Sequence, residues 1–178
     1  MLEPNLQVTA YTTIIELSMN SVYDFYVTSE NSAGTSLDSN IVSVRVASLP
    51  SQPQNVNTLL NGEFVDVSWD VPSDGGSAIT NYIIKVRGSD GVTYHQETTG
   101  CEGSDASTIA FGLCSIPKIN LLLSPFDLAW GDEIHATVSA VTAVGESQES
   151  AVGTVSYLLR LPDTPLNFRN VPETTLST

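Results

Sequence analysis

The chain has 178 residues, of which 41% are hydrophobic, and a formal net charge of −14 from 20 acidic and 6 basic residues. This apolar content is enough for a packed core and argues against wholesale disorder. The charge argues against nucleic acids and anionic membranes as partners, because both are bound mainly through Lys and Arg, and the sequence has no apolar run near the ~18 residues of a membrane span.

The first residues, Met1 to Asn5, have neither the basic start nor the apolar stretch of a signal peptide. The chain is therefore expected to be either cytosolic or an internal part of a longer secreted chain. Its two cysteines are compatible with a disulfide, although their number alone does not decide the compartment.

Alternating apolar and polar residues predict a series of β-strands. Val65, Val67 and Trp69 alternate with polar residues, and the Pro- and Gly-containing residues 71–76 end that strand. Further strands are predicted over residues 82–86, from 92 onward, over 134–140 and over 152–159. A helical period of 3.6 is not evident in any segment, although residues 116–123 would also suit a short helix.

The chain also contains an internal repeat. Residues 23–27 align with residues 134–138 at an offset of 111, and Leu49-Pro50 aligns with Leu161-Pro162 at an offset of 112. The alignment continues after each first segment with two matching sets, Asn31, Gly34, Ser36 and Ser39, and Thr142, Gly145, Ser147 and Ser150. A period of this length is that of a whole domain rather than a solenoid repeat.

The repeat predicts three parts of the chain. Residues 1–49 form the C-terminal part of one module, residues 50–161 form a complete module, and residues 162–178 form the first strand of the next. The Leu-Pro segments are then linkers, each stiffened by proline.

These residues resemble the fibronectin type III module, and the resemblance covers nearly the whole chain. It is carried early in the module by Val65-x-Val67-x-Trp69 and Tyr82, and late in the module by Leu17 and Tyr23. The resemblance implies an all-β fold of tandem antiparallel, immunoglobulin-like β-sandwiches. It also implies that Trp69 fills the core beside Tyr82, and that the Tyr23 hydroxyl bonds back to the chain just upstream.

The central module departs from the family pattern in two places. Ile134 follows Leu128 by six residues, as Tyr23 follows Leu17, so the corner hydroxyl is absent there. The segment around Cys101 to Cys114 is also longer than usual. The residues Cys114-Ser115-Ile116-Pro117, together with Pro125-Phe126-x-Leu128, resemble modules of large surface proteins in unicellular eukaryotes.

Cys101 and Cys114 bracket a polar segment, residues 102–108, that is expected to be flexible. A disulfide would pin this segment and remove about 3 kcal/mol of unfolded-chain entropy, whereas the alternative is a pair of buried free thiols. A zinc site is not expected, because two thiolates lack two further ligands at ordinary spacing. We favour the disulfide, which indicates an oxidising compartment.

Other candidate residues each have a structural alternative. His95 and His135 are expected on the surface, and no second group marks either one as a catalytic base. Trp130 is either an exposed anchor for a partner or a packing residue, and we favour packing. A cation site at a module junction is a further hypothesis, against the alternative of solvated acidic loops; its candidate ligands are Asp70, Asp74, Asp90 and Glu63.

The sequence predicts a non-catalytic extracellular or cell-surface spacer, structural or adhesive, within a long module array or surface fibre. It predicts no cofactor, and its expected partners are neighbouring modules, identical chains in a fibre, or other surface proteins. One alternative is a filament subunit, in which residues 165–171 of one chain complete the N-terminal module of the next. Another is an accessory module of a larger secreted enzyme.

Overall fold

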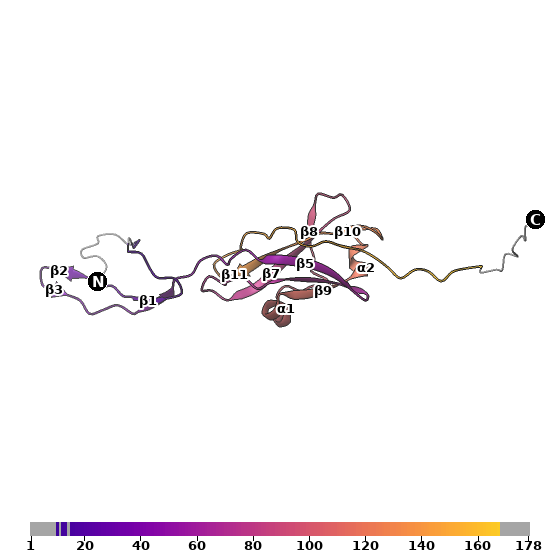
Figure 1. The fold of residues 1–178 in the computed structure, drawn as a ribbon. Helices are drawn as coiled ribbons and strands as arrows, with labels where there is room; N and C mark the ends of the chain where they lie inside the picture. The colour runs from indigo at the N-terminus through magenta and orange to yellow at the C-terminus, as the bar shows by residue number, and fades with distance from the viewer. Residues whose placement is uncertain (1–9, 11, 14, 168–178) are drawn as a thin grey trace, which may run out of the picture.

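The computed structural model describes residues 10, 12–13 and 15–167. Figure 1 shows a small N-terminal piece, a linker, a larger sandwich and an extended C-terminal segment along one direction. In the N-terminal piece, β1 (Val22–Phe25) pairs with β4 (Val42–Arg45), and β2 (Glu30–Asn31) pairs with β3 (Gly34–Thr35). Both pairs are antiparallel.

The central module contains two antiparallel sheets. One sheet has the order β5 (Gln54–Asn61), β6 (Phe64–Asp70), β9 (Leu113–Pro117). The other has the order β11 (Ala136–Thr142), β7 (Ile79–Arg87), β8 (Tyr94–Gln96). This arrangement confirms the predicted all-β fold of antiparallel sandwiches.

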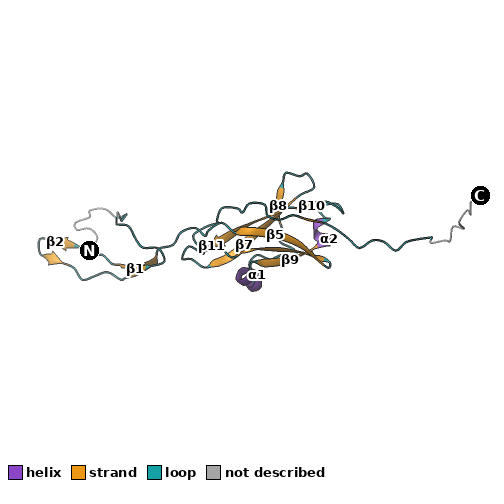
Figure 2. Ribbon diagram, in the orientation of Figure 1, coloured by secondary structure: helices purple, strands orange, loops and turns teal. Residues whose placement is uncertain are grey.

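Shorter elements close the ends and one side of the sandwich. A small ladder is formed by β10 (Glu133–Ile134) and β12 (Ser156–Tyr157). Two short helices lie within the described residues, α1 (Ala106–Phe111) and α2 (Lys118–Leu121). Figure 2 shows α1 outside the sheets and α2 at the end where the chain leaves the module.

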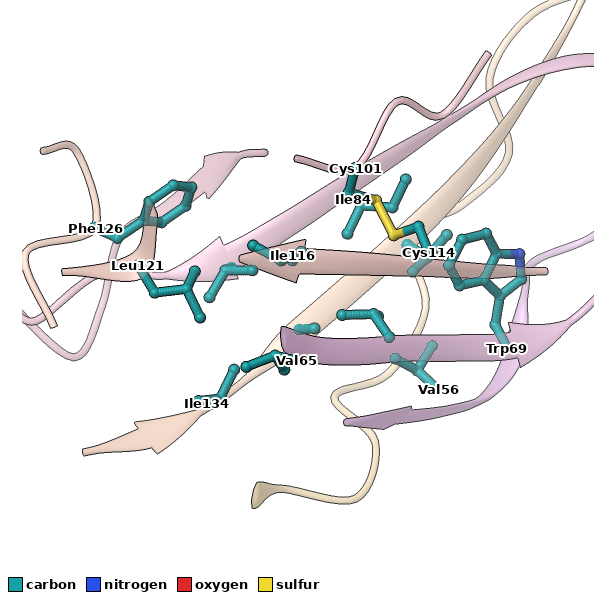
Figure 3. Packing of buried hydrophobic residues seen from close by; sticks show 14 of the residues in the cluster. Val56, Val65, Trp69, Ile84, Cys101, Cys114, Ile116, Leu121, Phe126 and Ile134 are labelled. Atoms are coloured by element: carbon teal, nitrogen blue, oxygen red, sulfur yellow. A yellow bond between two sulfur atoms is a disulfide. The ribbon is translucent and has the colours of Figure 1, made fainter. Parts of the chain in front are cut away.

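The core forms because alternate residues of each strand face the opposite sheet. On β6 the buried residues are Val65, Val67 and Trp69, and the residues between them are more exposed. The facing sheet contributes Tyr82, Ile84 and Val86 from β7, and Ala136, Val138 and Ala140 from β11. Leu128 and Ile134 are buried in the same cluster, part of which is drawn in Figure 3.

Trp69 and Tyr82 meet within this cluster. Their ring centroids lie 4.8 Å apart in an edge-to-face arrangement, which is favourable for aromatic quadrupoles. Both side chains are almost fully buried, and burial raises the pKa of the Tyr82 hydroxyl. The pair therefore links the two sheets through apolar contact.

The sequence repeat is also present in the strand pairing. Tyr23 lies opposite Val44 in the β1–β4 pair, and Ile134 lies opposite Ser156 in the β10–β12 pair. The offsets between the copies, 111 for the first members and 112 for the second, are those found in the sequence. The two parts of the chain therefore share one register.

Serine hydrogen bonds repeat in the same way. Ser39 Oγ accepts a hydrogen bond from Val27 N at 3.0 Å, and Ser150 Oγ accepts one from Val138 N at 3.0 Å. In the reverse direction, Ser39 N donates to Val27 O and Ser150 N donates to Val138 O, both at 2.9 Å. The same pattern joins Ser36 with Ser29 and Ser147 with Ala140.

The tyrosine corner is present in the N-terminal piece. Tyr23 Oη accepts a hydrogen bond from Ser18 N at 2.9 Å, just upstream in the chain, and this bond lowers the pKa of the hydroxyl. Leu17 beside it is half-buried. At the equivalent position of the central module, Ile134 is fully buried, so apolar packing takes the place of the hydroxyl bond.

Three local expectations need correction. Residues 106–111, within a segment expected to be irregular up to residue 108, form helix α1. The ambiguous segment 116–123 divides into the end of β9 and helix α2. The strand expected over 152–159 is limited to β12, with a single parallel bridge from Thr154 to Asn57 before it, because side chains supply much of the pairing there.

Truncating Leu158 to alanine should lower the free energy of unfolding by about 2–5 kcal/mol, because the side chain is fully buried. Leu59→Ala is the matched control, since that leucine is 60% exposed, and its effect should stay below about 0.5 kcal/mol. Urea denaturation measures both. Equal losses for the two variants would contradict this assignment of the core.

Candidate functional site

The Cys101–Cys114 disulfide is formed inside the core of the central module. Cys114 lies on β9 opposite Val67, and Cys101 lies in the segment that follows β8. The cysteines are 1% and 7% exposed, and Figure 3 shows the bond beside Ile84. The disulfide joins the segment after β8 to the edge strand of the opposite sheet, and it is shielded from solvent.

Helix α1 begins and ends with specific caps between the two cysteines. The Asp105 side chain accepts hydrogen bonds from Ser107 N and Thr108 N at the N-terminus. Gly112, with φ of 61°, ends the helix in the left-handed conformation and donates to Thr108 O. Asp105 and Gly112 are ordinary start and stop signals, and they could have predicted this helix from the sequence.

The segment between the cysteines bonds to the two central strands. Gly103 O accepts a hydrogen bond from Tyr82 N at 3.0 Å, and Gly112 O accepts one from Trp69 N at 2.8 Å. A Cβ atom at Gly103 would collide with Tyr82 O, so a residue without a side chain is needed for this approach. The segment therefore covers the side of the sandwich where β9 and β8 are edge strands.

A shallow, open depression lies beside the disulfide. Glu102 and Asp105 supply acidic groups to its lining, whereas Phe111 and Leu113 supply apolar surface. Phe111 is 75% exposed, so its ring is available to contact another molecule. The depression is too open to enclose a small molecule, and its chemistry is that of a protein surface.

The four acidic candidates are not brought together as a cation site. Asp70 accepts a hydrogen bond from Asn55 Nδ2 at 2.7 Å, and Asp74 accepts one from Gly76 N at 2.8 Å. Glu63 lies in the turn between β5 and β6. In the part of the chain that the structure describes, no group of three or more His, Cys, Asp or Glu residues is placed to hold a metal ion.

Asp90 organises the turn before β8. Its carboxylate accepts hydrogen bonds from the Thr93 hydroxyl and from the backbone N–H groups of Val92 and Thr93. These bonds favour the charged form and lower the pKa of Asp90 to about 2. The Thr93 hydroxyl makes the largest contribution.

Both histidines have structural neighbours. His95, on edge strand β8, packs edge-to-face against Phe126 with ring centroids 6.1 Å apart. His135 Nε2 lies 2.8 Å from Glu133, and its side chain is 16% exposed, so it is less exposed than the sequence pattern predicted. The hydrogen bonds from His135 and Tyr157 lower the pKa of the Glu133 carboxyl.

Trp130 keeps 42% of its surface exposed, so packing covers only part of the ring. It precedes Gly131, whose N–H donates to Leu158 O at 2.8 Å. The ring therefore lies at the end of the module where the chain leaves. Its use as an anchor for a partner stays a prediction.

Several of the described basic side chains are engaged within the chain. Lys85 pairs with Glu149 at 3.2 Å, and Arg160 pairs with Asp163 at 3.1 Å. Lys118 is buried and donates to Leu159 O at 2.8 Å. Such pairs are typical of structural roles, and the exposed ones contribute little to stability.

No known family model matches the chain. Its structure is similar to titin domains A168–A170, with a TM-score of 0.58 and 19% identity, over 81% of this chain and 43% of that one. It is also similar to the FN1–FN3 domains of chicken CNTN1, with a TM-score of 0.46 and 15% identity, over 76% of this chain and 42% of that one. The chain thus spans about two fifths of each of these two solved structures.

The sheet order and the likeness to the titin domains support a fibronectin type III-like sandwich fold. At this level of identity the likeness concerns the fold alone. Among the described residues, no helix has the length and apolar character needed to cross a membrane.

Replacing both Cys101 and Cys114 with alanine should lower the free energy of unfolding by about 3 kcal/mol, because the unfolded chain regains the entropy of the open loop. Chemical denaturation with and without a reducing agent measures the effect. The reducing agent should destabilise the original chain and leave the double variant unchanged. Equal stability of the original chain and the double variant without a reducing agent would contradict a stabilising role of the disulfide.

Thr93→Val should raise the pKa of Asp90 from about 2 toward the ordinary value of 3.8, because the hydroxyl donor is lost while the backbone donors remain. A pKa that is lower in the folded state stabilises the fold above the unfolded pKa, and this contribution is lost as the pH falls toward 2. Carbon NMR titration of the carboxyl group checks the shift. An unchanged titration midpoint of Asp90 would show that the Thr93 hydroxyl does not lower its pKa.

Proposed function

We propose that this chain belongs to a tandem array of fibronectin type III-like modules that acts as a non-catalytic extracellular spacer. The observation that carries the proposal is the repeated construction of the two parts. Strand register and serine hydrogen bonds recur at the offsets found in the sequence. Repetition of a whole module is the expected result of building length from copies of one unit.

The N-terminal piece and the central module also share the same hydrogen bonding at the end where the chain leaves them. Asn20 N donates to Val46 O at 2.8 Å, and Gly131 N donates to Leu158 O at 2.8 Å. Asn20 and Gly131 both have positive φ, at 59° and 103°. A common exit end supports an array in which one module follows another with similar geometry.

The extracellular location is supported by the buried disulfide, since such bonds persist in oxidising compartments. The acidic surface supports a role away from nucleic acids and anionic lipids. The partners proposed are neighbouring modules of the same chain and identical chains in a fibre. An adhesive role would use exposed groups such as Trp130 or Phe111.

A second candidate, the filament subunit, is favoured by one observation. Val27 in the N-terminal piece is 73% exposed, whereas its counterpart Val138 is fully buried in the central module. The N-terminal piece thus has apolar surface that added strands could cover. The proposed donor, residues 165–171, lies partly outside the described residues, and Leu166 within it is 84% exposed.

The spacer function predicts a location and a shape for the intact protein. Antibodies raised against residues 50–161 should label unpermeabilised source cells, and the purified native polypeptide should form elongated particles in electron microscopy. Mass spectrometry should find Cys101 bonded to Cys114 in that material. Labelling only after permeabilisation, with both thiols free, would overturn the extracellular assignment.

Short particles with hydrolytic activity would favour the accessory-module alternative. A polymer built of ~19 kDa chains would instead favour the filament subunit, because strand exchange assembles separate short chains, whereas an array is one long polypeptide.

A further inference from the structure

We propose that two loops of the central module form an entry socket that holds the linker and fixes the angle between the N-terminal piece and the central module. The entry socket consists of residues 73–77, between β6 and β7, and residues 143–146, after β11. Its occupant is the preceding part of the same chain, residues 46–51 together with the turn at Asn20. This inference deepens the proposed spacer function, on which its biological meaning rests.

The linker is bonded to the socket through the main chain. Ser48 N donates a hydrogen bond to Gly75 O at 2.9 Å, and Ser51 N donates one to Ser73 O at 2.9 Å. Pro50, which lies between the two serines, is buried. A segment with two such bonds and a buried proline is held in one path, whereas a free linker would sample many.

Gly75 permits the close approach of the linker. It has φ of 65°, and a Cβ atom at this position would lie 2.6 Å from Ser48 O and 2.8 Å from Leu49 O. Both oxygens belong to the backbone, so they could move away only if the linker itself moved. The bond from Ser48 to Gly75 and the approach of the two segments therefore require glycine here.

A second glycine lies close to the N-terminal piece. Gly76 has φ of 91°, and a Cβ atom there would lie 3.4 Å from Asn20 Cα. Asn20 is in turn held to the linker, because its N–H donates to Val46 O at 2.8 Å. It is also held to the end of β4, because its Oδ1 accepts from Arg45 Nη1 at 3.0 Å. The turn at Asn20 and the linker thus enter the socket together.

The other loop also approaches the linker. A Cβ atom at Gly145 would lie 2.7 Å from Leu49 Cδ2. Gln52 Nε2 donates to Glu149 O at 2.6 Å, just beyond this loop. The linker is therefore contacted from both loops, and the geometry is that of a docked joint.

The same joint could be repeated along an array. Gly131 at the exit of the central module corresponds to Asn20, and Leu161 corresponds to Leu49. Leu161 is 83% exposed, compared with 54% for Leu49. The fitting partner for this exit is another module of the same kind, with glycine at positions equivalent to 75 and 145.

Gly75→Ala tests the socket, with Gly62→Ala as the matched control. Gly62 has a similar φ of 57°, but its Cβ position has open space around it, so the control carries the same backbone strain without the collision. Spin labels on cysteines introduced at exposed Ser32 and Val92 report the distance between the two parts by pulsed electron paramagnetic resonance. Thermal melting checks that each variant is folded.

The parent and Gly62→Ala should give one narrow distance distribution, and Gly75→Ala should broaden or shift it. A broad distribution in the parent, or no change in Gly75→Ala, would overturn the inference. If Gly75→Ala fails to fold, hydrogen exchange in the unaltered chain decides instead. The Ser48 and Ser51 amides should then exchange slowly, and fast exchange at both would overturn it.

A flexible joint would leave the spacer function standing, because cell-surface labelling and particle length test that function separately. Absence of surface labelling, with slow exchange at Ser48 and Ser51, would retain the socket and reject the extracellular spacer.

Discussion

Strand β6 places Val65, Val67 and Trp69 on one face, and the rest of the central module covers that face. The pleat allows only alternate residues to point inward, so a slip of one residue would turn all three toward solvent. Trp69 makes this register specific, because its ring meets Tyr82 across the sandwich at 4.8 Å. The disulfide, α1 and the entry socket are all positioned by strands that depend on this contact.

The sequence was most informative where period-two alternation is strong. The strands through Trp69 and Tyr82 were predicted because one face of each is more buried than the other, and that difference produces the pattern. The strand through Val138 was predicted from the same alternation, although Thr137 and Ser139 between its apolar residues are buried as well. Helix α1 was missed because it has only six residues and is defined by its caps, not by a hydrophobic period. The Thr154 bridge could not be predicted either, since it is a single parallel contact to a strand far away in the sequence.

The candidate sites also differ in how far the sequence could predict them. Cys101 and Cys114 were found because a disulfide needs only two residues and a loop that can be closed. The acidic candidates are not gathered into a cluster of ligands in the described part of the chain. Residues such as Asp74 and Asp90 bond the backbone of their own turns, and sequence spacing does not separate that use from ligand binding. The entry socket could not be predicted from the sequence. A glycine that allows another segment to approach closely has the same sequence pattern as any turn glycine, and only the structure shows that the two segments are neighbours.

The serine bonds have a consequence for folding of neighbouring copies. Ser147 Oγ accepts from Ala140 N and donates to Gln148 O, so a hydroxyl is inserted where two backbones would otherwise pair directly. The resulting strand edge is irregular, and it is bonded to its own partner strand by side-chain hydroxyls as well as by backbone groups. A strand without hydroxyls at these positions would pair poorly with this edge, whereas an adjacent module with the same serines could satisfy it and exchange strands during folding.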